Sequence, residues 1–240
     1  MVVLLEYDTD KIVENLRETM TDIGIRKDSA TSKLSHDLSW VTQDYILTHD
    51  VIPIIEEGPQ TERGHSARVA EYGVVLSDIL RFGKQERILK FLADISHDRG
   101  KLKFKDCYAR LNHDRETLDR MRRGHVLPQN IALEYGPIVA SAIEQHHKHQ
   151  GTFSAPYPNK LSLAQTPESF FLSQLIAIPD FWDALTSRPC KKTGNLHTYS
   201  EATDLFLQEY ADMKIQYNGS LFPRVNTTGK AIVDVFLRAL

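Results

Sequence analysis

A chain of 240 residues with 41% hydrophobic residues and a formal net charge of −3 can bury a substantial core, and fits one large domain or a domain with an N-terminal extension. The near-neutral charge gives no support for a nucleic-acid polymer or a membrane surface as a partner. Two cysteines are too few for a disulfide framework, and Glu6 interrupts the apolar start before a signal-peptide core can form. We therefore expect a soluble, reduced, cytoplasmic protein without a membrane-spanning segment.

Hydrophobic residues recur mostly at the period of an α-helix, and alternating strand patterns are almost absent, so the sequence predicts an all-α fold. The predicted helices, in chain order, are 10–25, 32–50, 66–82, 84–98, 130–147, 167–187, 200–214 and 228–240. The first two form a helical N-terminal extension over residues 1–58, which resembles a lid or a dimerisation element of a homodimer. The remaining helices form the main domain over residues 59–240.

Four of these helices place a histidine or an aspartate on the face that otherwise carries apolar residues. His65 and His146 continue apolar faces at helical spacing, and Asp98 and Asp180 follow apolar residues in the same way. A single inward histidine is usually a satisfied core residue, but several buried charged groups from distant segments need a common compensation. Bound divalent metal would supply it, because imidazole nitrogen and carboxylate oxygen are good ligands for iron, manganese, zinc or nickel.

Short motifs around these residues occur in a recognisable order. They are "GHSARVAEY" at 64–72, "ISHDRGKL" at 95–102, "RRGHVLP" at 122–128, "IEQHHKHQGT" at 143–152 and "IAIPDFWDALTSRP" at 176–189. In this order they resemble the HD phosphohydrolases and, more closely, the HD-GYP phosphodiesterases of bacterial signalling. The resemblance covers about residues 60–240. It implies an HD-domain helical bundle for the main domain.

The resemblance also implies a site with two divalent transition-metal ions, for which iron or manganese is expected. The implied metal ligands are His65, His97, Asp98, His125, His146, His147 and Asp180, with Asp98 bridging the two ions. A hydroxide between the ions would attack phosphorus. Asp98 and Lys101 are the implied catalytic residues, because Lys101 matches a lysine that touches the scissile phosphate. Without that role, Lys101 would be a solvated lysine at a helix end.

A further set of residues is expected on the substrate side of the site. The implied substrate-binding residues are Lys101, Lys148, Asp183, Arg188 and Lys191. Asp183 could instead make a polar contact within the bundle, and Arg188 could bind the last carbonyls of its own helix. Arg68 flanks His65 but could equally be a surface residue.

The loop that names the HD-GYP subgroup, HHExxDGxGYP, is altered in this chain to "HHKHQGTFSAPYP", with Lys148 in place of the glutamate. The expected function is metal-dependent hydrolysis of a cyclic dinucleotide, such as cyclic di-GMP, or of another nucleotide phosphoester. Two alternatives remain open. An HD-type diiron oxygenase would use a similar His/Asp set, and a catalytically weak nucleotide-binding module would account for the altered loop.

Overall fold

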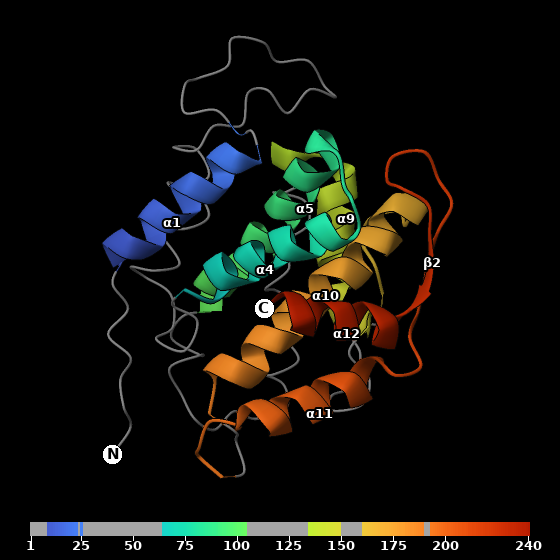
Figure 1. The fold of residues 1–240 in the computed structure, drawn as a ribbon. Coiled ribbons are helices and arrows are strands. Elements are labelled where there is room, and N and C mark those ends of the chain that lie inside the picture. The colour runs from blue at the N-terminus through green and yellow to red at the C-terminus, as the bar shows by residue number, and fades with distance from the viewer. Residues whose placement is uncertain (1–8, 24, 26–63, 105–133, 150–159, 190–192) are drawn as a thin grey trace.

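The computed structural model describes residues 9–23, 25, 64–104, 134–149, 160–189 and 193–240 (Figure 1). Within these ranges the chain forms seven α-helices, two 3₁₀ helices and one two-stranded sheet, which confirms the all-α expectation. The elements are α1 (Thr9–Asp22), α4 (His65–Ile79), α5 (Lys84–Ser96), η4 (Arg99–Phe104), α9 (Pro137–Gln145), η5 (His146–His149), α10 (Pro167–Ser187), α11 (Tyr199–Tyr210), β1 (Lys214–Tyr217), β2 (Val225–Thr228) and α12 (Gly229–Ala239). The predicted helix 32–50 lies outside the described residues.

The ends of the long helices follow local signals in the sequence. The helix predicted over 167–187 is confirmed as α10, which begins with Pro167 in its first turn after a capping box of Thr166 and Ser169. Thr198 and Glu201 make a second capping box at the start of α11. These side chains satisfy backbone N–H groups that have no partner within the helix. Helix starts are therefore fixed by chemistry that is local in the sequence.

The predicted helix over 200–214 is wrong at its end. It stops at Tyr210, and Lys214 instead begins β1, which pairs antiparallel with β2 in the register Lys214 to Thr228. Side chains along β1 alternate between exposed and buried, which is the strand period. Four residues of that alternation are too few to stand out against the helical pattern that precedes them.

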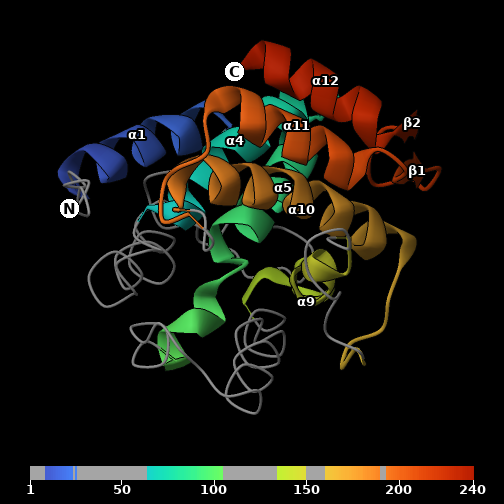
Figure 2. The same ribbon diagram turned by 90° about the horizontal axis from the view of Figure 1, so that it is seen from below.

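Helix α10 lies at the centre of the bundle. It contacts α4, α5, α9 and α11, and Figure 2 shows it between α9 on one side and α11 with α12 on the other. Nearly all of its length is buried, so side chains on more than one of its faces meet other helices. An arrangement of this kind lets one helix line a polar site with one face and an apolar core with another.

At the N-terminal end, α1 contacts α4 and buries Leu16 and Met20 in the common hydrophobic core. Across the described residues, every helix is either too short or too polar to cross a membrane.

Candidate metal centre

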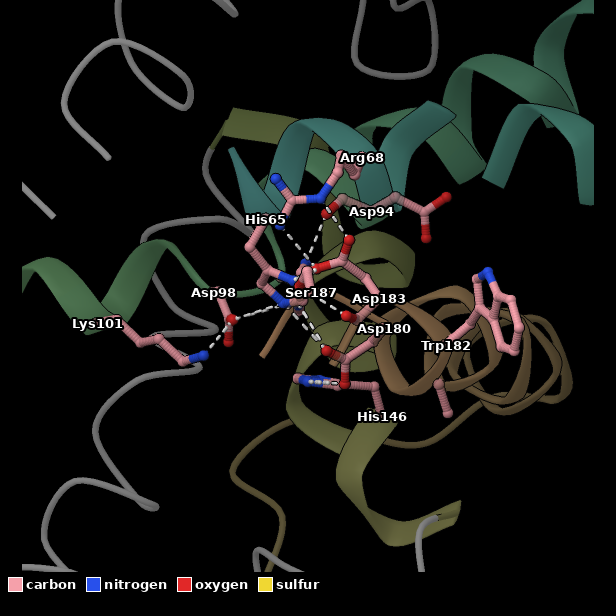
Figure 3. A network of polar contacts seen from close by, with 12 residues as sticks. His65, Arg68, Asp94, Asp98, Lys101, His146, Asp180, Trp182, Asp183 and Ser187 are labelled. Atoms are coloured by element: carbon pink, nitrogen blue, oxygen red, sulfur yellow. Dashed lines mark hydrogen bonds and ion pairs between the residues drawn. The ribbon is translucent and has the colours of Figure 1, made fainter. Parts of the chain in front are cut away.

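Four buried side chains meet where α4, α5 and α10 approach one another (Figure 3). His65 is the first residue of α4, His97 caps the C-terminus of α5 with Asp98 directly after it, and Asp180 lies within α10. One ligand atom from each of the four lies within 4.8 Å of all the others. Helix ends and one helix face therefore bring together four of the seven metal ligands expected from the sequence.

The short distances in this set all join atoms that can bind a metal. His65 Nε2 lies 3.1 Å from an Asp180 oxygen and 3.3 Å from Asp98 Oδ2. His97 Nε2 lies 3.3 Å from Asp98 Oδ2, 3.6 Å from Asp180 Oδ1 and 3.3 Å from His65 Nε2. Two imidazoles thus turn the same ring nitrogen toward each other and toward two carboxylates.

A second group of candidate ligands adjoins the first and shares Asp98 with it. Asp98, His146 and His147 also have ligand atoms within 4.8 Å of one another. His146 caps the C-terminus of α9, and its Nε2 lies 4.0 Å from Asp180 Oδ2. The remaining predicted ligand, His125, lies outside the described residues. Asp98 is therefore the side chain common to both groups.

The opposite nitrogen of each buried imidazole faces an oxygen acceptor. His97 Nδ1 lies 2.6 Å from the Asp94 carbonyl, and His146 Nδ1 lies 2.6 Å from the Ile143 carbonyl. His65 Nδ1 lies 2.6 Å from a carboxylate oxygen of Asp183. Each acceptor favours a proton on Nδ1 and makes Nε2 the nitrogen that would bind a cation, so the donor set fits a divalent metal.

Electrostatics at the cluster reflect the two carboxylates. Burial and the Arg188 charge lower the pKa of His65, but hydrogen bonds to aspartates, Asp180 first, outweigh them and raise it to about 9. Burial likewise lowers the pKa of His97, whereas Asp98 and Asp180 raise it to about 10. Burial tends to raise the pKa of each carboxyl group, but the histidines hold the pKa of Asp98 and that of Asp180 well below their usual range. The cluster therefore attracts positive charge, as protons or as metal ions.

Several predicted substrate-side cations lie near the cluster. Lys101 forms an ion pair with Asp98 from the start of η4, and its side chain is only 12% exposed. Arg188 caps the C-terminus of α10, close enough for its charge to act on His65. Lys148 is exposed in η5, and Lys191 lies outside the described residues. Lys101 thus contacts a candidate metal ligand directly.

Asp183, which was expected on the substrate side or in a polar contact within the bundle, contacts a candidate metal ligand. The side chain is fully buried behind His65, where it also receives hydrogen bonds from Arg68 and Ser187. Sequence reasoning left Arg68 open as a surface residue and gave Ser187 no role. Their only signal is helical spacing, since Arg68 follows His65 by three residues and Ser187 follows Asp183 by four.

The polypeptide around η5 is held by two further contacts that the sequence did not predict. Glu144, which is buried, accepts hydrogen bonds from the backbone N–H groups of Ser162 at 2.6 Å and Leu163 at 3.0 Å. His149 Nε2 lies 2.8 Å from Ser173 Oγ in α10, and burial together with the Lys148 charge lowers the pKa of His149 to about 4. The His149 contact holds η5, with the candidate ligands His146 and His147, against α10, and the Glu144 contacts hold the end of α9 to the segment before α10.

Comparisons with models of known protein families, with curated proteins and with solved structures find no match for this chain. The likeness to HD phosphohydrolases therefore depends on the motifs alone. The structure adds a buried His/Asp cluster, compatible with a metal site, in which the motif residues meet.

Proposed function

We propose that this protein is a metal-dependent phosphohydrolase that cleaves a nucleotide phosphoester. The proposal depends on one observation. Asp98 belongs to both groups of candidate ligands, and it also forms an ion pair with Lys101. Two adjacent cation sites and a lysine on their common carboxylate suit an in-line attack on phosphorus. The motifs that resemble HD phosphohydrolases support the same reaction class.

The proposed ligands are the six cluster residues that the structure brings together and His125, which lies outside the described residues. In the proposal, His65, His97, Asp98 and Asp180 hold one divalent ion, and Asp98 holds a second together with His146, His147 and His125. Such ions supply positive charge that lowers the pKa of a bound water and polarises the phosphoryl oxygens. Iron or manganese is the proposed metal, since mixed imidazole and carboxylate sets accept both.

Lys101 is proposed to contact the phosphate rather than a metal ion. Its ammonium pairs with Asp98 and is partly accessible, so it can exchange that contact for a phosphoryl oxygen as negative charge develops there. A lysine in this place stabilises the transition state without occupying a ligand position. The catalytic role therefore depends on its charge.

The substrate class is proposed to be a nucleotide phosphoester, and a cyclic dinucleotide remains the narrower form of the proposal. Arg188 acts on the cluster through its charge, and exposed Lys148 follows two candidate ligands in η5. Positively charged side chains near a catalytic site attract anionic substrates such as phosphorylated molecules. The altered loop at 150–159 lies outside the described residues, so the choice among nucleotides rests on experiment.

The test combines metal analysis with a substrate panel. Protein produced in metal-replete medium should contain about two transition-metal ions per chain, a stoichiometry typical of paired-metal hydrolases. It should hydrolyse at least one cyclic or linear nucleotide, and chelation should remove that activity. Metal-loaded protein that cleaves no phosphoester but consumes dioxygen when reduced would support the oxygenase alternative. Protein that takes up no metal on reconstitution would contradict both.

A further inference from the structure

The histidine at the start of α4 differs from the other two buried histidines in how its Nδ1 is satisfied. His97 and His146 stand at helix C-termini, and each faces the carbonyl three residues earlier, in the last turn of its own helix. His65 is the first residue of α4 and follows Gly64, whose φ of 73° lies in the left-handed region. Because α4 begins at His65, no earlier turn of that helix can offer its Nδ1 a carbonyl, and the acceptor comes from another helix.

Asp183 supplies that acceptor from 118 residues away in the sequence. Its Oδ2 lies 2.6 Å from His65 Nδ1 on the side of the ring opposite Asp98 and Asp180, as Figure 3 shows. Arg68 donates to both oxygens of the carboxylate, at 2.5 Å from Nε and 3.1 Å from Nη2. Ser187 Oγ donates to Oδ2 at 2.9 Å. The carboxylate is therefore held from three directions.

This arrangement leaves Asp183 little capacity for a substrate. A carboxylate offers about four lone-pair sites, and of these four contacts three fall on Oδ2 and one on Oδ1, so little acceptor capacity remains. The side chain is also completely buried, so a nucleotide cannot reach it without displacing His65 or Arg68. The same geometry matches a metal-binding histidine whose second nitrogen is oriented by a carboxylate.

We propose that Asp183 is a positioning residue for the metal centre, which orients His65 and increases the basicity of its Nε2, with Arg68 and Ser187 holding the carboxylate in place. Of the three buried histidines, His65 is oriented by a carboxylate, whereas His97 and His146 face backbone carbonyls. In this proposal Asp183 increases the affinity of the centre for metal, and it does not contact the substrate. The inference rests on the metal centre of the proposed function but not on phosphoester cleavage.

The test compares the wild-type protein with Asp183→Asn, which keeps the side-chain shape and removes the charge. Metal-free protein is titrated with Mn²⁺ alone, and KM for a cleaved phosphodiester is measured at saturating Mn²⁺. A positioning role predicts that Mn²⁺ affinity falls by about 10- to 100-fold while KM is unchanged. Unchanged Mn²⁺ affinity with a raised KM would overturn the inference and return Asp183 to substrate binding.

Three further measurements keep the result specific. Asp78→Asn removes an exposed carboxylate of α4 that pairs with Arg87 of α5, and it should leave Mn²⁺ affinity unchanged. Ser187→Ala, which retains the contact between Asp183 and His65, should lower Mn²⁺ affinity by less than Asp183→Asn, and it carries the test if Asp183→Asn does not fold. A fall in the stability of metal-free Asp183→Asn with normal Mn²⁺ affinity would show a purely structural role and overturn the inference.

The outcomes also separate this inference from the proposed function. Wild-type protein that binds Mn²⁺ but cleaves no phosphoester would remove the proposed function, while the affinity difference between wild type and Asp183→Asn would still decide the role of Asp183. Wild-type protein that binds no metal would overturn both.

Discussion

Two buried regions on either side of α10 are stabilised in opposite ways. On one face, Asp180 and Asp183 join a cluster of imidazoles and carboxylates. On another, Trp182 and Phe206 pack with ring centroids 5.1 Å apart in a core of aromatic side chains, and Figure 3 shows Trp182 pointing away from the cluster. The aromatic core gains free energy simply by leaving water, whereas the cluster needs a cation to offset its buried charge.

The neighbouring ion pair of Lys90 and Asp94 shows a third arrangement. Both side chains are fully buried in α5 and pair with each other one helical turn apart. Burial lowers the pKa of Lys90 and raises that of Asp94 to about 7. Gly73 of α4 leaves room for this pair, because a Cβ there would lie 1.7 Å from Asp94 Oδ2. The opposite charges of Lys90 and Asp94 compensate each other, so this pair needs no bound ion. The His/Asp cluster differs because its residues could hold a metal ion.

The largest effect is expected from Asp98→Ala, which removes the side chain shared by both ligand groups. The variant should lose bound metal and turnover together, because each proposed ion loses a carboxylate and Lys101 loses its partner. Metal content and hydrolysis are measured on the same preparation, with Asp78→Ala as the matched control. Near-normal turnover with both metals retained would show that Asp98 is not the shared ligand.

Phe206→Ala probes the opposite side of α10. Truncating this fully buried ring should lower the free energy of unfolding by about 3–5 kcal/mol through lost burial and the cavity left behind. Because the aromatic core needs no cation, the loss should be the same with metal and with chelator, as measured by denaturant unfolding. A loss that depends strongly on metal would mean that the two regions are not independent.

The ion pair can be tested with Lys90→Met. The substitution leaves the Asp94 carboxylate buried without its cation and should cost about 3–5 kcal/mol of stability. The double variant Lys90→Met/Asp94→Leu should recover part of that loss, since it removes the unpaired charge as well. Denaturant unfolding of wild type and these two variants measures both changes. Equal stability of Lys90→Met and wild type would indicate that the pair contributes little.

Lys101→Ala is expected to keep its metals and turn over about a hundredfold more slowly, a size typical for the loss of one transition-state contact. The effect should fall on kcat rather than KM, because the ammonium contact strengthens only as charge develops on the phosphoryl group. Steady-state kinetics on a cleaved phosphodiester measure it. An unchanged rate would return Lys101 to a surface role.

The smallest effect concerns pH and metal removal. The pKa of His65 is raised from its ordinary value of 6.5 to about 9, so protonation stabilises the metal-free fold below pH 6.5, and this contribution is lost as the pH rises through 9. Metal requires neutral imidazoles, and its binding should therefore release protons and strengthen over the same range. Thermal unfolding from pH 6.5 to 10, with and without Mn²⁺, should show opposite trends. Parallel trends would argue against metal at His65.

Much of the candidate site follows from the sequence because it depends on local periodicity. The apolar faces of the helices place His65, Asp98 and Asp180 toward the interior, and the structure brings these residues together with His97. The bounds of α10 were predictable for the same reason, since a proline and a capping box mark its start. Residues whose direction is set by their own helix can be recognised before the fold is known.

What the tertiary structure alone decided is which distant residues meet. The contact of His65 with Asp183 spans 118 positions, and the carbonyl that orients His97 lies only three residues away. Spacing within a helix can reveal the second kind of contact but not the first, because no local pattern encodes the packing of α4 against α10. The same holds for β1 and β2. Their pairing gives two four-residue segments a strand conformation that their own sequences do not predict. Local propensity fixes the direction of a side chain, and long-range packing fixes the partner it finds.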